Sequence, residues 1–140
     1  MDRILIADSS ESLRHMLRAV LERAGFQVAE AADGVEAIQL VAQDRYGVLL
    51  ADLRLLMLPK SGGDVLKTLK EVDHFCRVIV MAAYSDIESA VRAVREGAHD
   101  FLTKPIDPDR VLQIVRRALE GRPRASREGG PGLVGAPQGP

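Results

Sequence analysis

The chain has 140 residues, of which 46% are hydrophobic, and its formal net charge is −1. This length supports one ordinary hydrophobic core, and the near-neutral charge does not call for a nucleic acid or an anionic membrane as a partner. The single cysteine, Cys76, excludes an internal disulfide, and no apolar run approaches the length of a membrane-spanning helix. We therefore expect one domain of the reducing cytoplasm.

Short apolar runs alternate with segments of helical periodicity along residues 1–120. The apolar runs predict five strands, at residues 4–7, around Val28, and at 48–51, 78–81 and 101–102. The periodic segments predict five helices, over residues 13–21, 37–41, 65–72, 87–94 and 111–119. Gly25 and Gly97 follow two of these helices, where a residue with positive φ is expected, and Asp33-Gly34 marks the turn into another.

This alternation predicts an α/β fold. Strands joined by helices of this length need right-handed parallel crossovers, so we expect a doubly wound parallel sheet of five strands with five helices on its two faces. Residues 121–140 are rich in Gly and Pro and have no periodic apolar face. We expect them to form a flexible tail after a domain that spans residues 1–120.

Polar residues stand where three of the predicted strands end. Asp8 ends the first strand, Asp52 the third and Lys104 the fifth. The carboxyl ends of parallel strands meet at one edge of such a sheet, where ligands bind, so we expect these side chains to converge. Two simpler interpretations stay open: Asp8 with Glu11 can cap the first helix, and Asp52 can be a turn residue.

Three segments resemble the receiver domain of two-component response regulators, namely ILIADSSESLRHML, GVLLADLRL and VIVMAAYSDIESAVRAVREGAHDFLTKPID. The resemblance covers residues 3 to about 119 and is strongest to receivers of nitrogen-regulation activators. The resemblance implies a flavodoxin-like sheet in the strand order 2-1-3-4-5. It also implies an aspartate that accepts a phosphoryl group from a histidine kinase or a phosphotransfer protein.

The resemblance assigns a role to each matching residue. Asp52 matches the phosphoacceptor, and Lys104 matches the lysine that contacts the phosphate. Asp8, Asp52 and the backbone carbonyl of Arg54 match the ligands of a magnesium ion. Phe101 matches the aromatic residue that shifts on activation. The chemistry suits these residue types, because Mg²⁺ binds one or two carboxylates with water and phosphate oxygens, and lysine offers a compact positive charge.

Three positions depart from the family pattern. Ser9 stands where a second acid is usual, and because its hydroxyl is a weak substitute we expect weak Mg²⁺ binding. Ala82 replaces the Thr or Ser whose hydroxyl binds the phosphoryl group, so this switch position has no side-chain donor. Leu56 replaces a proline, and the later Pro59 and Gly62 indicate two or three extra residues in this loop.

Two functions remain open, and both describe a signalling module, not an enzyme. The first is a phosphorylated receiver that controls a downstream protein through the face formed by helix 87–94, strand 101–102 and helix 111–119. The second is a pseudo-receiver that docks a protein independently of phosphorylation. A second copy of the chain is a further candidate partner. A nucleotide- or flavin-binding protein is disfavoured, because DSSES follows the first strand in place of a glycine-rich loop.

Overall fold

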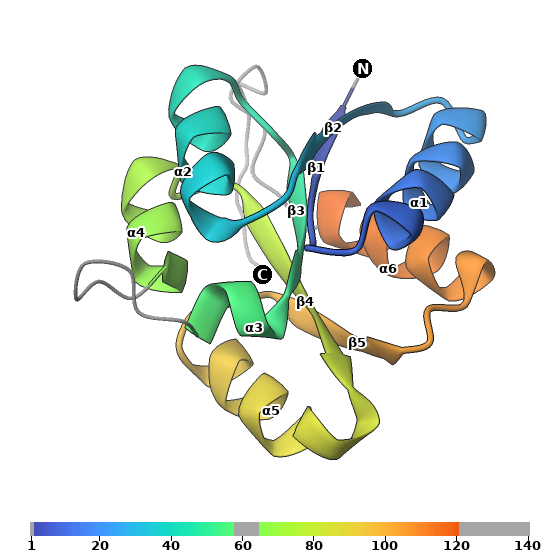
Figure 1. Cartoon of the computed structure of the whole chain (residues 1–140). Helices are drawn as coiled ribbons and strands as arrows, with labels where there is room; N and C mark the ends of the chain where they lie inside the picture. Colours follow the sequence, from blue (N-terminus) through green and yellow to red (C-terminus); the bar gives the residue numbers. More distant parts are fainter. Residues whose placement is uncertain (1, 58–64, 121–140) are drawn as a thin grey trace.

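Five parallel strands form one sheet in the order β2-β1-β3-β4-β5 (Figure 1). This arrangement comes from a computed structural model, which describes residues 2–57 and 65–120. The strands are β1 (Arg3–Ala7), β2 (Gln27–Ala31), β3 (Val48–Asp52), β4 (Arg77–Ala83) and β5 (Asp100–Lys104). The predicted fold class and strand order are confirmed. The predicted tail and the positions of Pro59 and Gly62 lie outside the described residues.

Helices connect the strands and cover both faces of the sheet. They are α1 (Glu11–Arg23), α2 (Gly34–Gln43), α3 (Leu53–Met57), α4 (Val65–Val72), α5 (Ile87–Arg95) and α6 (Pro108–Glu120), with a short 3-10 turn, η1 (Tyr84–Asp86), before α5. Figure 1 shows α1 and α6 on one side of the sheet and α2, α4 and α5 on the other. The sheet therefore forms the middle of three layers.

Alternation along the strands divides the core in two. In β1, Ile4 and Ile6 belong to one buried cluster, and Leu5 and Ala7 belong to the other. The first cluster continues into buried side chains of α1 and α6, the second into those of α2, α4 and α5. Because successive side chains of a strand point to opposite faces, a continuous apolar run is what a strand buried on both faces requires.

Two glycines end helices as the sequence predicts. Gly25 follows α1 with φ of 100°, and Gly97 follows α5 with φ of 128°. A side chain at either position would be strained, because L-residues rarely adopt this left-handed region. The predicted turn into α2 is also present, since Asp33 caps that helix by accepting a hydrogen bond from the Glu36 amide at 2.8 Å.

The short helix α3 is a departure from the prediction of five helices. It begins directly after Asp52, where the sequence suggested only a loop. Leu53 and Leu56 lie one helical turn apart and are each 3% exposed. Burying a leucine stabilises by about 1.5–3 kcal/mol, which offsets the poor intrinsic stability of so short a helix. The apolar run after Asp52 therefore packs on the core, and six helices result.

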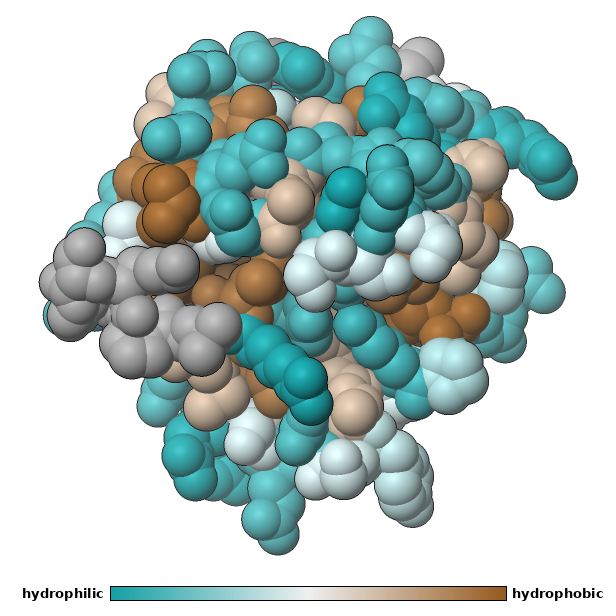
Figure 2. Space-filling model, viewed as in Figure 1, coloured by the Kyte–Doolittle hydropathy of each residue, from teal (hydrophilic) through white to brown (hydrophobic). Residues whose placement is uncertain are grey.

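The surface is mixed in polarity. On the face shown in Figure 2, hydrophilic side chains separate small hydrophobic patches. The exposed large hydrophobic residues among those described come from different elements: Val35, Met57, Val72, Phe75 and Tyr84. Scattered apolar residues of this kind are normal on a protein surface. Within residues 2–57 and 65–120, the helices are too short and too polar to cross a bilayer.

Candidate functional site

The ends of β1, β3 and β5 bring two carboxylates and one ammonium group together. Lys104, the last residue of β5, places its Nζ 2.8 Å from Oδ2 of Asp8 and 3.6 Å from Oδ1 of Asp52. Asp8 directly follows β1, and Asp52 ends β3, which pairs with β1 in parallel register. The predicted convergence is therefore present, and one lysine nitrogen contacts both acids.

Both carboxylates are buried. Asp8 is 1% exposed and Asp52 is 9% exposed, while the side chain of Lys104 keeps 27% of its surface in solvent. Burying a carboxylate is costly unless it is paired and hydrogen-bonded. Lys104, the most exposed of the three side chains, supplies the opposite charge to both acids. The site carries two negative charges and one positive charge, an arrangement that retains attraction for a cation.

Every polar atom of Asp8 has a partner. Its amide donates to the Ala31 carbonyl at 3.1 Å, and its carbonyl accepts from Nη1 of Arg14 at 2.7 Å. Its Oδ1 accepts from the Ser10 amide at 2.8 Å, and its Oδ2 accepts from Lys104. Asp8 is thus fixed in place by contacts from β2, α1, its own loop and β5 together.

The interpretation of Asp8 as the cap of α1 is wrong. Ser10 is the N-cap residue, and its Oγ accepts from the Leu13 amide at 3.2 Å. Asp8 lies two residues before Ser10, and its carboxylate accepts a hydrogen bond from the Ser10 amide of this loop. Glu11 lies within the helix and its carboxylate is 3.8 Å from the His15 ring. Because serine caps the helix, the Asp8 side chain is available to the site.

The other predicted ligands are less well placed than Asp8 and Asp52. Ser9 is exposed. Arg54 lies within α3, and its amide makes a long 3.5 Å contact with Oδ1 of Asp52. The structure thus places the amide of Arg54, near the start of α3, beside Asp52, and its carbonyl stays a predicted ligand.

The two predicted switch residues lie on neighbouring strands. Ala82 of β4 is 1% exposed and belongs to the buried cluster on the α5 side of the sheet. Phe101 of β5 is partly buried and packs against this same cluster. Strand register places Phe101 beside Val80 and Thr103 beside Ala82. Ala82 is thus a member of an apolar cluster, and its methyl group contributes no hydrogen-bond donor to the site.

The donor set is the minimum for a magnesium ion. Among residues 2–57 and 65–120, no group of three or more His, Cys, Asp or Glu side chains is arranged to hold a metal. Asp8 and Asp52 are nevertheless two carboxylates that share one contact, Lys104. Because Mg²⁺ often binds one or two carboxylates and completes its octahedron with water and phosphate, this pair fits the ion without a third acid.

Sequence reasoning missed the pair formed by Arg14 of α1 and Glu30 of β2. Nε of Arg14 donates to Oε1 of Glu30 at 2.9 Å, while Nη1 of the same guanidinium reaches the Asp8 carbonyl. A charged residue inside a predicted strand is unusual, and Glu30 could have been singled out on that ground. Its partner lies 16 positions away on a different element, so spacing alone could not have identified Arg14.

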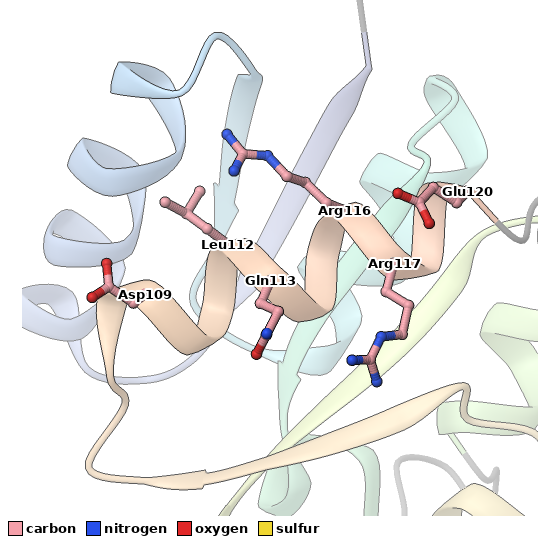
Figure 3. Close-up of a pocket in the computed structure, with 6 residues that line it drawn as sticks. All are labelled: Asp109, Leu112, Gln113, Arg116, Arg117 and Glu120. Carbon is pink, nitrogen blue, oxygen red and sulfur yellow. The ribbon is translucent and has the colours of Figure 1, made fainter.

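A shallow groove of about 390 Å³ lies elsewhere, on the outer surface of α6. Its lining residues all belong to that one helix: Asp109, Leu112, Gln113, Arg116, Arg117 and Glu120. Figure 3 shows the side chains of Arg116 and Arg117 leaving the helix in different directions. With mixed charges and walls from a single helix, this groove offers no group of converging polar atoms such as Asp8, Asp52 and Lys104 provide.

The fold and the three charged side chains at the carboxyl edge of the sheet agree with the family that the sequence matches. The family model "Response regulator receiver domain" matches residues 4–116. The chain therefore belongs to the response regulator receiver domain family, whose members are signalling modules of two-component systems. The resemblance found in the sequence is confirmed.

Curated relatives agree with this assignment. The chain is 38% identical over 120 residues to the C4-dicarboxylate transport transcriptional regulatory protein DctD of Pseudomonas aeruginosa, covering 86% of this chain and 26% of that protein. It is 30% identical over 118 residues to sporulation initiation phosphotransferase F of Bacillus subtilis, covering 84% of this chain and 94% of that protein. The chain thus spans about a quarter of the transcriptional regulators it matches and nearly all of the shorter relative.

Solved structures show the same fold. The receiver domain of NtrX from Brucella abortus aligns with a TM-score of 0.77 at 28% identity, and the alignment covers 84% of this chain and 98% of that domain. Nitrogen-regulation activators are also among the matched relatives, with NtrC of Escherichia coli 34% identical over 116 residues, covering 83% of this chain and 24% of that protein.

Proposed function

We propose that Asp52 is the phosphoacceptor of this receiver and takes a phosphoryl group from a histidine kinase or a phosphotransfer protein. The observation that carries the proposal is the contact of one lysine nitrogen with both Asp8 and Asp52 at the carboxyl edge of the sheet. If Asp52 were only a turn residue, it would have no need of an ion pair with Lys104, which lies 52 positions away in the sequence. A site for an anionic group does need a cation held beside the attacking carboxylate.

The transfer exchanges one bond for another. A carboxylate oxygen of Asp52 forms a bond to phosphorus, while the bond from phosphorus to the donor histidine nitrogen breaks. The electron pair of that bond leaves with the imidazole, which takes up a proton. Lys104, already within reach of Asp52, neutralises charge on the transferred group. Asp8 holds the Lys104 ammonium at 2.8 Å and so keeps it beside the acceptor.

Asp8 and Asp52 are the residues that would hold a magnesium ion. The ion, when bound, neutralises negative charge on the incoming phosphoryl group. With Ser9 in place of a second acid, Asp8 and Asp52 are the two carboxylates that the described residues bring together for the ion. We therefore keep the prediction that Mg²⁺ binds weakly.

Output is assigned to the face that contains α5, β5 and α6. Phe101 of β5 packs against the cluster that contains Ala82, so this face is in apolar contact with the end of β4. A downstream protein or a second copy of the chain would bind there. The transcriptional relatives extend well beyond the region that this chain matches. An output domain that acts with this face is therefore a proposal too. The cytoplasm is kept as the location, as the single cysteine led us to expect.

Phosphorylation is tested by incubating the whole chain with Mg²⁺ and a small phosphodonor and measuring its intact mass. We expect a gain of one phosphoryl group that is lost at high pH and maps to Asp52. Asp52→Asn should abolish the gain, whereas Asp109→Asn, which changes an exposed acid on α6, should leave it intact. An unmodified wild-type protein, or an adduct that persists in Asp52→Asn, would refute the assignment and favour the docking-module alternative.

A further inference from the structure

A guanidinium from α1 holds the loop that follows β1. Arg14 uses one nitrogen, Nη1, for the Asp8 carbonyl at 2.7 Å and another, Nε, for Glu30 Oε1 at 2.9 Å. The side chains of Arg14 and Glu30 are only 14% and 17% exposed. Because the guanidinium is planar and rigid, these two bonds fix the Asp8 peptide relative to β2.

The position of the Asp8 side chain depends on its own peptide groups. β1 ends at Ala7, which is the last residue of that strand in register with β2 and β3. Beyond it, the Asp8 amide still donates to Ala31, while the carbonyl depends on Arg14. Fixing the amide and the carbonyl on either side of a Cα fixes the direction of the Cα–Cβ bond. Arg14 therefore influences the direction in which the Asp8 carboxylate points.

Glu30 in turn holds Arg14. It lies on β2 beside Ile6 of β1, and its Oε2 accepts a second hydrogen bond from Nη1 of Arg18 at 2.9 Å. Burial acts to raise the pKa of Glu30, but hydrogen bonds from Arg18 and Arg14 outweigh it, so the pKa lies below its ordinary value. Glu30 is consequently ionised near neutral pH and remains a fixed anchor.

We propose that Arg14, anchored by Glu30, is a positioning residue of the acceptor site. It sets the orientation of Asp8 and thereby the geometry that Asp8 and Asp52 offer to a divalent cation. The expected effect on cation binding rests on the proposed function of the site. The expected effect on the orientation of Asp8 does not.

Arg18 provides a matched control. It lies one turn further along α1, carries the same charge and shares the same partner, Glu30. Its second contact is Glu22, at 3.0 Å, and not Asp8. If the arginines only attach α1 to the sheet, removing either one should have similar consequences. If Arg14 positions Asp8, only its removal should disturb the acceptor site.

The experiment compares Arg14→Gln, Arg14→Lys and Arg18→Gln in the full chain. Without ligand, the amide proton shift of Ser10, which donates to Asp8 Oδ1, and the side-chain carbonyl carbon shift of Asp8 report the orientation of that carboxylate. With Mg²⁺ alone, an NMR titration of the amides near Asp52 gives the dissociation constant. Urea unfolding of each variant measures its stability separately.

We expect both Arg14 variants to move the two ligand-free signals and to weaken Mg²⁺ binding about tenfold, as loss of a supporting hydrogen bond does at other metal sites. Arg14→Lys should not rescue, because an ammonium cannot span both partners. Arg18→Gln should leave the ligand-free signals in place and change the Mg²⁺ constant less than about twofold.

Equal shifts of the ligand-free signals in Arg14→Gln and Arg18→Gln would overturn the positioning role, as would full rescue by Arg14→Lys. If Arg14→Gln does not fold, Glu30→Gln removes the anchor while leaving Arg14 in place and should produce the same shifts. A wild-type protein that binds neither Mg²⁺ nor beryllofluoride would refute the proposed function, and the ligand-free signals would still decide the role of Arg14.

Discussion

The ends of β1 and β4 lie at the same edge of the sheet but are built in opposite ways. After β1, Asp8 is buried with each of its polar atoms hydrogen-bonded, and one of these bonds reaches Lys104. Near the end of β4, Ala82 is equally buried and belongs to an apolar cluster. The charged part of the acceptor site is thus firmly held, while position 82 offers no polar side chain to respond to it.

This difference separates two properties that receivers combine. Binding a cation and an anionic group depends on Asp8, Asp52 and Lys104, which the fold brings together. Transmitting that event depends on a side chain with different contacts in two states, because a ligand shifts an equilibrium only by its differential affinity. Ala82 removes one source of that difference. Four experiments test the contrast between these two strand ends.

The largest effect is expected at the β1 end, from Asp8→Asn. Removing one of two buried carboxylates should weaken Mg²⁺ binding about a hundredfold, since a charge interaction of about 3 kcal/mol is lost. Isothermal titration would measure this, with Asp109→Asn on α6 as the control that leaves the affinity unchanged. Unaltered affinity in Asp8→Asn would mean that the cation binds elsewhere.

Adding charge beside Asp8 should act in the opposite direction. Ser9→Asp places a third carboxylate at an exposed position, and we expect Mg²⁺ to bind about tenfold more tightly, a gain of about 1.4 kcal/mol. Ser12→Asp adds the same charge one turn away on α1 and should tighten binding less than about twofold. Equal affinities of Ser9→Asp and the wild-type protein would remove the argument for a weakened metal site.

At the β4 end, a hydroxyl should restore communication with Phe101. We expect beryllofluoride with Mg²⁺ to change the wild-type amide spectrum near Asp52 but to perturb residues 84–106 only weakly. Ala82→Thr should extend the changes across residues 84–106, at a cost in stability of about 1–3 kcal/mol because the site is fully packed. Ala82→Ser adds less volume and serves if the threonine variant is unstable.

Ala83→Ser is the matched control, because this residue has the opposite strand orientation. The Ala83→Ser variant should respond to beryllofluoride as the wild-type protein does. If beryllofluoride with Mg²⁺ causes large shifts across residues 84–106 of the wild-type protein, the end of β4 transmits the change at Asp52 without a hydroxyl.

The smallest effect concerns the anchor of the β1 loop and its pH dependence. The pKa of Glu30 is lowered from 4.5 in the folded state, so the folded protein binds fewer protons than the unfolded chain. The resulting stability is present above about pH 4.5 and is lost as the pH falls through the folded-state pKa. Glu30→Gln should therefore be less stable than wild type near neutral pH, with a smaller deficit near about pH 3.

Urea unfolding followed by circular dichroism would measure the deficit, since the chain has no tryptophan. Glu22→Gln is the control, because the Glu22 carboxylate pairs with Arg18 at the exposed surface and such pairs contribute little to stability. A deficit of the same size at both pH values would show that the charge of Glu30 is not what stabilises the folded state.

Much of the acceptor site could be predicted because it follows from strand ends. Asp8, Asp52 and Lys104 each stand where an apolar run stops, and parallel strands place such ends at one edge. What could not be predicted is how they are connected. The contacts of one lysine with both acids, and of Arg14 with the Asp8 carbonyl, depend on side-chain directions that arise only when helices pack on the sheet.

The five strands and the glycines after α1 and α5 could be predicted from local pattern, which each short segment carries independently of the others. The strand order came through the family resemblance, and the three charged residues were found where predicted strands end. Packing in three dimensions, by contrast, makes a helix of Leu53–Met57, since burial of Leu53 and Leu56 stabilises it where a loop was expected. It also leaves the capping of α1 to Ser10, because Lys104, 96 positions away, and Arg14, on α1 itself, hold Asp8 toward the site.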